Sequence, residues 1–566
     1  MKNHLVAKIL NDVSYALEIL DVEFKPRAYA RAARSVENLS KPIEDIYAEG
    51  GKKALDNIPG VGESIANKIE EIIKTRSLKY RNKLIRKIGF DFTELMNIEG
   101  LGPKMIKKLH EELGVKSLAD LDKAAKEGRI RSLEGFGEKT EKKIMDNVEF
   151  ARVKNKRVLL STAFNEAQEV KKELIPFAEK VEVAGSIRRM KETIGDIDIL
   201  AVAKRGKHEE IIKKFARLGK VVMEGETKIR IRLDSGLNCD LRIIELDSFG
   251  SALQYFTGSK DHSIELRKIA MKKGLKLSEY GLFKNDKKIA GRNEEEVYKK
   301  LGMQCVPPEL RENIGEVELA QKNKIPELIN YDAIKGDLQM HTKYSDGGNS
   351  VEEMVLKCKN LGYEYVGISD HAGNLKIANS MGAKEVSKQR KEIQNLNIKG
   401  IKVLQGAEVN ILADGSLDVP DKLLKEFDFV IAAVHSKFNM ARDEMTKRLI
   451  KAIKNPYVII LAHPTGRKVL RKESYDADWK EVFKAAKEHG VLLEINAHPE
   501  RLDLPDSLIN QAVKMNCNLI INTDSHSVDN LEYMKFGIGQ ARRGGCTRKA
   551  VANSLSFTKF LEFLKK

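Results

Sequence analysis

The stretch VAGSIRRMKETIGDIDIL, residues 183–200, decides the fold of the central part of the chain. It places a Gly-Ser pair and two arginines ahead of Asp196 and Asp198, which stand two positions apart in an apolar run. Side chains at i and i+2 of a strand point to the same face, so both carboxylates are held toward one point. The isoleucines beside them can anchor the strand in a core. The stretch therefore predicts a site for one or two hard divalent cations.

The length and composition predict a soluble protein of several domains. A chain of 566 residues exceeds one ordinary core, and we expect two to four domains. The sequence has no run of about 18 uncharged apolar residues, so no membrane span is predicted. Residues 1–20 lack a signal-peptide core, and we therefore expect a cytoplasmic protein. The five cysteines are scattered without a CxxC pair, which argues against a disulfide framework or a cysteine zinc site.

The charge balance favours a polyanionic partner. Lysine and arginine number 100 against 83 aspartates and glutamates, a formal net charge of +17. Such an excess is typical of proteins that bind nucleic acid. Many basic proteins are simply soluble, so the charge becomes informative only together with a motif that contacts phosphate.

Three segments of the N-terminal third repeat one pattern: IPGVGESIANKI from Ile58, IEGLGPKMIKKL from Ile98 and LEGFGEKTEKKI from Leu133. Gly-x-Gly allows a tight turn, and the free N–H groups of the following helix suit a phosphate. Gly-x-Gly also serves as an ordinary helix connection, but three copies with basic followers favour DNA. The pattern resembles the helix-hairpin-helix motif, which grips the DNA backbone without reading sequence. The residues concerned are Gly60, Gly62, Gly100, Gly102, Gly135 and Gly137, followed by Lys104, Lys107, Lys108, Lys139, Lys142 and Lys143.

The basic stretch FKPRAYARAARSVENL, residues 24–39, together with the first hairpin resembles the small lyase domain of polymerase β-like enzymes. The resemblance implies that Lys68 forms a Schiff base with the sugar at an abasic site. It also implies that Lys25 and Tyr29 hold the 5′-phosphate. A lysine partly desolvated among cationic neighbours loses basicity and becomes nucleophilic. The alternative is that Lys68 is a solvated surface lysine.

A second carboxylate strand and an aromatic motif complete the central pattern. Asp240 stands in an apolar frame within RIRLDSGLNCDLRII, and YFTGS follows at residues 255–259. The ordered set GSIRR, GDIDIL, CDLRI and YFTGS resembles the nucleotidyltransferase palm of family X DNA polymerases. The resemblance implies transfer of a nucleotide from a dNTP to a primer, with Mg²⁺ held by Asp196, Asp198 and Asp240.

The same resemblance assigns the nucleotide contacts. Ser186, Arg189 and the backbone at Gly195 would hold the triphosphate, because the planar fork of arginine meets phosphate oxygens bidentately. The two aromatic residues of YFTGS would pack on the sugar and disfavour a ribose 2′-hydroxyl. Lys260 and Ser263 depart from the family pattern, which leaves nucleotide preference open. The implied nucleotide set is Gly185, Ser186, Arg189, Gly195, Tyr255, Phe256 and Gly258, and Arg267 is placed at the template strand.

The last third of the chain places ligand-type residues at the ends of apolar runs. Five such runs (YEYVGISDH, IKVLQGAE, FDFVIAAVH, YVIILAH and CNLIINTDSH) end in aspartate, glutamate or histidine. A parallel α/β barrel gathers residues from the carboxyl ends of its strands in one site. The pattern therefore predicts a metal cluster.

This region resembles the polymerase and histidinol phosphatase (PHP) domain attached to bacterial and archaeal family X polymerases, through GDLQMHTKYSDG, LAHPTGR, LEINAHPERLDL and NTDSHS. The resemblance implies Mn²⁺ or Zn²⁺ and a 3′–5′ exonuclease that also processes abasic sites. The matched ligands are His341, Asp346, His371, Glu408, His435, His463, Asp524 and His526.

Two positions depart from the PHP pattern. Gln339 stands where the family usually has the first histidine of His-x-His, and Asn410 stands where relatives often carry aspartate. An amide oxygen is a weak ligand for zinc or manganese. A folded but impaired PHP domain is therefore the alternative to an active nuclease.

We expect a multidomain chain with α-helical helix-hairpin-helix domains, an α+β palm and thumb, and a C-terminal α/β domain of the PHP type, a distorted β/α barrel. The expected boundaries are 1–85 for a lyase-like domain, 86–150 for a DNA-binding subdomain with two further hairpins, 151–248 for the palm, 249–318 for a nucleotide-selection subdomain, 319–335 for a linker and 336–566 for the PHP domain.

The leading hypothesis is a repair polymerase that fills short gaps and carries an appended nuclease, acting as a monomer on gapped or primer-template DNA of any sequence. The alternative is a metal-dependent DNA phosphoesterase whose polymerase region mainly binds DNA. A third hypothesis, a scaffold at DNA ends, is disfavoured because a scaffold has no need of three converging carboxylates.

Overall fold

The computed structural model describes residues 3–37, 39, 43–58, 60–98, 101–138, 140–142, 144–145, 157–373 and 379–565. The predicted DNA contacts Gly100, Lys139 and Lys143 lie outside the described residues. The chain divides into two compact units, residues 1–157 with 232–238 and residues 158–231 with 239–566. Among the described residues, no helix is both long enough and apolar enough to cross a membrane.

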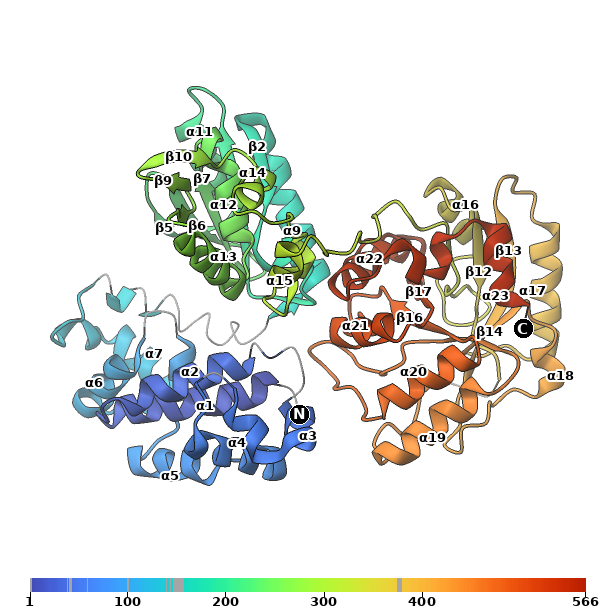
Figure 1. Ribbon diagram of the computed structural model, residues 1–566, viewed down its shortest axis with the longest axis horizontal. Coiled ribbons are helices and arrows are strands. Elements are labelled where there is room, and N and C mark those ends of the chain that lie inside the picture. The colour runs from blue at the N-terminus through green and yellow to red at the C-terminus, as the bar shows by residue number, and fades with distance from the viewer. Residues whose placement is uncertain are drawn as a thin grey trace. The chain divides into compact units, whose positions relative to one another are not determined.

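The first unit is helical, and its seven longer described helices run in blue to cyan in Figure 1. Val6, Ala32, Ile69 and Ile106 belong to one continuous buried core, so the segments expected as separate domains at 1–85 and 86–150 share their apolar interior. The helices are α1 (Asn3–Ile19), α2 (Lys25–Glu37), α3 (Ile43–Asp56), α4 (Glu63–Thr75), α5 (Lys79–Ile88), α6 (Pro103–Leu113) and α7 (Leu118–Lys126).

The three glycine segments fold alike. In each, a backbone N–H closes a tight turn onto the carbonyl three residues earlier, just ahead of a helix. Gly62 and Gly102 are the extended N-cap residues of α4 and α6, so the free N–H groups of both helices begin at these glycines. The closing bonds are Val61 to Ile58 at 2.9 Å, Leu101 to Ile98 at 3.1 Å and Phe136 to Leu133 at 2.9 Å.

The palm is a five-stranded sheet in the order β2-β4-β7-β6-β5. Along β4 the side chains of Ile197 and Ile199 are fully buried while Asp196 is exposed and Asp198 is half-buried, which is the alternation that the sequence predicts. The elements are α9 (Leu160–Leu174) and α12 (Phe249–Thr257), which contact β4, with β2 (Ala178–Val183), β4 (Asp196–Ala203), β5 (Lys220–Glu224), β6 (Lys228–Arg232) and β7 (Asn238–Ile243).

The Gly-Ser pair of the opening stretch lies in a short helix. Gly185 and Ser186 begin the one-turn helix α10 (Gly185–Arg188). Gly185 turns the chain at φ +60°, and the backbone N–H of Arg189 then donates to its carbonyl at 3.3 Å. A single helical turn has no apolar periodicity of its own, so no sequence pattern indicates it.

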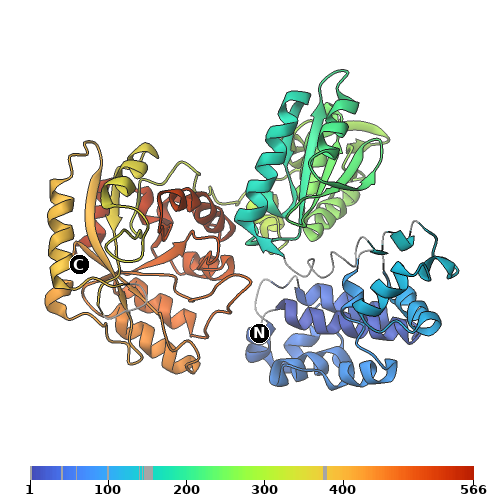
Figure 2. The same cartoon turned by 180° about the vertical axis from the view of Figure 1, so that it is seen from behind.

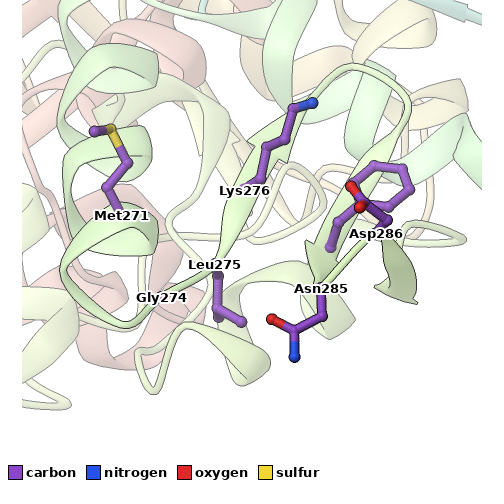
Figure 3. Close-up of a pocket in the computed structure, with 7 residues that line it drawn as sticks. Met271, Gly274, Leu275, Lys276, Asn285 and Asp286 are labelled. Atoms are coloured by element: carbon purple, nitrogen blue, oxygen red, sulfur yellow. The ribbon is translucent and has the colours of Figure 1, made fainter.

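The nucleotide-selection region has α13 (Lys260–Lys272), the antiparallel strands β8 (Lys276–Ser278), β9 (Gly281–Lys284) and β10 (Lys287–Ala290), α14 (Glu294–Lys300) and α15 (Glu316–Gln321). Asn285 and Asp286, both at positive φ, form the turn between β9 and β10. A pocket of about 330 Å³ lies beside this turn, and Figure 3 shows residues that line it. The charged residues of its lining are Lys276 and Asp286, and none of the predicted site residues lines it.

The C-terminal domain is a barrel of seven parallel strands in chain order, which confirms the predicted architecture. A parallel bridge between Met340 and Ser525 nearly closes it, and helices surround the strands (Figure 1 and Figure 2). The strands are β11 (Gly336–Asp337), β12 (Tyr365–Ile368), β13 (Lys402–Asn410), β14 (Phe429–Ala433), β15 (Val458–Leu461), β16 (Leu492–Asn496) and β17 (Leu519–Asn522). The helices are α16 (Val351–Asn360), α17 (Ala383–Asn395), α18 (Asp421–Leu424), α19 (Arg442–Ile453), α20 (Trp479–Glu488), α21 (Asp506–Lys514), α22 (Met534–Arg543) and α23 (Phe557–Leu564).

Candidate active sites

The predicted palm carboxylates lie on two neighbouring strands. Asp196 and Asp198 open β4, and Asp240 lies on β7, the next strand of the sheet. Gly185 packs directly against this group, because a Cβ atom on it would lie 2.2 Å from Oδ2 of Asp198. Both this close approach and the positive φ require glycine. The Gly-Ser pair and the Asp-x-Asp pair of the sequence therefore form one structural unit.

The palm group has excess negative charge. Burial, followed by the negative charges of Asp196 and Asp240, raises the pKa of Asp198 to about 7. A divalent cation relieves this kind of repulsion, so the donor set fits Mg²⁺. Asp240 has a second partner that the sequence did not reveal: Arg230 of β6 donates to it bidentately, from Nε at 2.5 Å and from Nη2 at 2.9 Å. Only the pairing of β6 with β7 brings the two together.

Several of the predicted nucleotide residues lie in or next to the short helix α10. Ser186 lies in its first turn and Arg189 at its end. The Arg189 side chain donates from Nε to Glu312 at 3.1 Å and from Nη1 to the carbonyl of Thr257. A Cβ atom on Gly258 would lie 3.2 Å from Nη1 of the same arginine, so the YFTGS turn lies against it. Gly195 directly precedes β4 and is exposed.

The two aromatic residues of YFTGS form an edge-to-face pair at the end of α12. The ring centroids of Tyr255 and Phe256 are 5.1 Å apart. The Arg242 guanidinium lies 4.3 Å from the Phe256 centroid, and that of Arg267 lies 6.0 Å from the Tyr255 centroid. Both rings are half-buried, so a sugar can contact them.

All eight predicted ligands of the barrel come together. Glu408 is buried, and its two carboxylate oxygens lie within 3.3 Å of nitrogens from three histidines. Three overlapping groups could each hold an ion: His341, Asp346, His371 and His526; His371, Glu408 and His435; and His341, Glu408 and Asp524. His463 joins the second through Glu408. The distances are 3.3 Å from His341 to Glu408 and to Asp524, 3.7 Å from His371 to Asp346, 3.6 Å from His526 to Asp346, and 3.0 and 3.1 Å from His435 and His463 to Glu408.

The electrostatics of the barrel cluster also fit metal ions. Both ring nitrogens of His341 are buried without a hydrogen bond, and so is Nδ1 of His371 and His435. Burial lowers the pKa of His371 to about 4, so its ring is neutral and its nitrogens can act as ligands. Buried imidazoles that lack hydrogen bonds beside carboxylates form a donor set suited to Mn²⁺ or Zn²⁺.

Comparisons with known proteins agree with both sites. The DNA polymerase β thumb matches residues 252–312, the PHP domain 337–498, a helix-hairpin-helix domain 1–78 and a SAM-like helix-hairpin-helix tandem 92–148. The DNA polymerase/3′-5′ exonuclease PolX of Bacillus subtilis strain 168 is 34% identical over 571 residues, 99% of each chain. The chain belongs to the PolX family. A probable phosphatase of Thermoanaerobacter sp. strain X514 is 33% identical over 178 residues, covering 30% of this chain and 70% of the relative.

In this PolX chain, Gln339 contacts the predicted metal-ligand cluster through its amide nitrogen. Its Nε2 donates to Oε2 of Glu408 at 2.8 Å, the side chain is fully buried, and its oxygen has no hydrogen-bond partner. The residue therefore fixes the orientation of the carboxylate shared by three histidines, a contact that ligand counting from the sequence did not predict.

Residues of the predicted lyase site also lie near one another in the PolX chain. Nζ of Lys68 lies 5.8 Å from the ring centroid of Tyr29 and 5.2 Å from that of Tyr80. The two rings stack 6.3 Å apart. Burial, with the charge of Lys25 as a smaller cause, lowers the pKa of Lys68. Sequence reasoning misses Tyr80 because it lies outside the hairpin.

Arg501 is a further residue that the sequence did not single out. Its Nε lies 3.3 Å from Oδ2 of Asp524, and it follows the β16 strand in the HPERLDL motif. The guanidinium beside a metal-ligand carboxylate is suited to a phosphate. The motif itself is visible in the sequence, but only the fold shows that its arginine reaches the ligand cluster.

Proposed function

We propose that this protein is a DNA polymerase that fills short gaps in DNA repair and removes nucleotides from 3′ ends with its PHP domain. Whole-length similarity to a relative named DNA polymerase/3′-5′ exonuclease supports this. The observation that carries the proposal is that one chain gathers three carboxylates in the palm and eight ligand-type residues in the barrel.

In the palm, Asp196 and Asp198 would hold two Mg²⁺ ions. Asp240 would be a further ligand of one of these two, the catalytic ion. Bound there, Mg²⁺ lowers the pKa of the primer 3′-hydroxyl and neutralises the leaving pyrophosphate. Ser186 and Arg189 orient the triphosphate of the dNTP from the end of α10, and the Tyr255–Phe256 pair contacts its sugar. Arg189 already lies against the YFTGS turn, so one residue joins the phosphate and sugar subsites.

In the barrel, the eight ligands would hold Mn²⁺ or Zn²⁺. These ions activate water and stabilise the charge that develops on the phosphorus oxygens. Gln339 keeps Glu408 in place, and Arg501 binds the phosphate of the 3′-terminal nucleotide. The hydrogen bond from Gln339 to Glu408 favours an active nuclease over an impaired one, since the glutamine supports the ligand set.

The substrate would be gapped or primer-template DNA of any sequence, gripped through the free N–H groups at Gly62, Gly102 and Gly137. Helix N-termini bind phosphate without sequence selection. We further propose that the protein acts as a monomer in the cytoplasm, with the six segments expected from the sequence, of which the first two share one apolar core.

A second activity, removal of 5′-deoxyribose phosphate, is favoured by the surroundings of Lys68. Its amine lies near two tyrosine rings, and burial lowers its pKa. The lowered pKa increases the neutral, nucleophilic form that a Schiff base requires. Lys25 and Tyr29 would bind the 5′-phosphate.

One experiment tests the leading proposal. A gapped, 5′-phosphorylated primer-template is incubated with Mg²⁺ or Mn²⁺, with and without dNTPs. Asp196→Ala should abolish extension and keep shortening, His371→Ala should do the reverse, and Asp247→Ala, at an exposed carboxylate, should change neither. Shortening without extension by the unmodified protein would support the phosphoesterase alternative, and neither activity would support the scaffold.

A further inference from the structure

The barrel contacts the palm through a buried arginine. The contact is with residues 189–192, the loop that follows α10 and begins with the proposed triphosphate ligand Arg189. Arg543, the last residue of α22, is 6% exposed. Its Nη1 donates to the backbone carbonyl of Arg189 at 2.8 Å and to Oε1 of Glu312 at 2.9 Å, and its Nη2 donates to Asp506 at 2.5 Å. Nη1 also lies 3.5 Å from the carbonyl of Glu309. The fork of one guanidinium therefore joins the barrel to the loop proposed to bind the triphosphate.

Glu312 connects Arg543 to the side chain of Arg189. Oε1 of Glu312 accepts from Nε of Arg189 at 3.1 Å and from Arg543 at 2.9 Å. Although burial alone would raise it, the pKa of Glu312 is lowered to about 2 by Arg543, Lys191 and Arg189. The carboxylate stays ionised and is shared between an arginine of the barrel and an arginine of the palm.

Neighbouring residues of the loop also contact the barrel. A Cβ atom on Gly539 of α22 would lie 2.8 Å from Cγ of Met190, so the helix and the loop are in close contact. Glu192 pairs with Arg467 at 2.6 Å. Loop positions 189, 190 and 192 are thus each held by a different residue of the barrel.

Sharing Glu312 affects how available Arg189 is to a phosphate. A carboxylate that pairs with one arginine alone competes directly with an incoming triphosphate for that guanidinium. Where a second arginine takes part of the carboxylate charge, the competition weakens. The Arg543 bond to the Arg189 carbonyl in addition fixes the backbone that carries the side chain.

We propose that Arg543 of the barrel is a positioning residue for the polymerase reaction: it holds the Arg189 backbone and shares Glu312, so that Arg189 is oriented for the triphosphate of the dNTP. The inference rests on the proposed function, in which Arg189 binds triphosphate. It assigns the PHP domain a role in nucleotide binding that is separate from hydrolysis at its metal cluster.

The test uses the full chain with Arg543→Gln and measures KM for dNTP and kcat for extension, with shortening of the 3′ end as a folding control. Loss of two charge-assisted hydrogen bonds predicts a rise of about tenfold or more in KM for dNTP, with a smaller change in kcat and unchanged shortening. Binding of dNTP to a complex with a dideoxy-terminated primer should weaken by the same factor.

The adjacent Arg542→Gln is the matched control. Arg542 bonds Glu309 and the Ile329 carbonyl but not the loop, so KM for dNTP should stay as it is. An equal rise in both variants, or no rise for Arg543→Gln, would overturn the inference. Should Arg543→Gln lose shortening as well, Arg543→Lys decides: its single ammonium cannot reproduce the fork, and an unchanged KM for dNTP would refute the proposal.

Arg189→Ala separates this inference from the proposed function. If Arg189→Ala leaves KM for dNTP unchanged, the triphosphate role of Arg189 is wrong and the inference falls with it. If Arg189→Ala raises KM and Arg543→Gln does not, only the positioning role of Arg543 is wrong.

Discussion

Replacing Glu294 by glutamine should destabilise the polymerase region by an amount that depends on pH. Glu294 is buried on α14 and accepts from both terminal nitrogens of Arg188, at 2.9 and 2.6 Å, and from Arg311 at 2.5 Å. Although burial opposes ionisation, Arg311 and Arg188 lower the pKa of Glu294 to about 2 from 4.5. The carboxylate thus pairs with two arginines, one of which is fully buried.

The magnitude follows from the pKa values of Glu294 in the folded and unfolded chain. A tenfold change in the acid dissociation constant corresponds to about 1.4 kcal/mol, so ionised Glu294 contributes about 3 kcal/mol at pH 7. Because its pKa is lower in the folded chain, this stability is complete above the unfolded value of 4.5 and is lost as pH falls toward 2. At pH 4 the contribution should be smaller by about 1 kcal/mol.

Amide hydrogen exchange resolved by mass spectrometry, on peptides from α12 to α14 in a urea series, measures this free energy. Glu294→Gln should cost about 3 kcal/mol at pH 7 and about 2 kcal/mol at pH 4. Glu295→Gln, at the exposed neighbour, should cost less than about 0.5 kcal/mol at either pH. A cost for Glu294→Gln that is below about 1 kcal/mol, or that is the same at both pH values, would refute the electrostatic account.

Two further predictions concern the ends of the chain. Borohydride trapping of the protein on abasic-site DNA should rise with pH and level off below the ordinary lysine pKa of 10.5, because burial lowers the pKa of Lys68. Lys68→Ala should abolish the trapped product, and Lys74→Ala should retain it. Trapping that survives Lys68→Ala would exclude this lysine. Gln339→Ala removes the hydrogen bond to Glu408 and should slow 3′-end shortening by about tenfold, while extension on the same DNA continues. Gel assays of both reactions check this. Undiminished shortening would show that Glu408 does not need the hydrogen bond from Gln339.

The parts of the structure that depend on local pattern could be predicted from the sequence. The alternation of Asp196, Ile197 and Asp198 defined a strand with one polar face, because side-chain direction in a strand has a period of two. Ligand residues at the ends of apolar runs defined the barrel site, because parallel strands deliver their carboxyl ends to one edge. These signals lie within a few residues of one another.

The contacts that orient the site residues could not be predicted in the same way. Arg543 and Arg189 are 354 positions apart, and Arg230 meets Asp240 only when β6 pairs with β7. An arginine has no periodic signature that names its partner. Such pairs depend on tertiary packing, and a single amino-acid sequence carries no record of it.

The two predicted metal sites differ in the protein groups that offset the negative charge of their carboxylates. Glu408 lies among His341, His435 and His463, and the pKa of His341 is raised well above its usual value because Asp524 and Glu408 outweigh its burial. In the palm, Arg230 pairs with Asp240, while the pKa of Asp198, raised to about 7 by burial and by Asp196 and Asp240, leaves part of this carboxyl protonated near neutral pH. Metal binding at either site would therefore be linked to proton release, and at each site an arginine competes for a ligand carboxylate, Arg230 for Asp240 and Arg501 for Asp524.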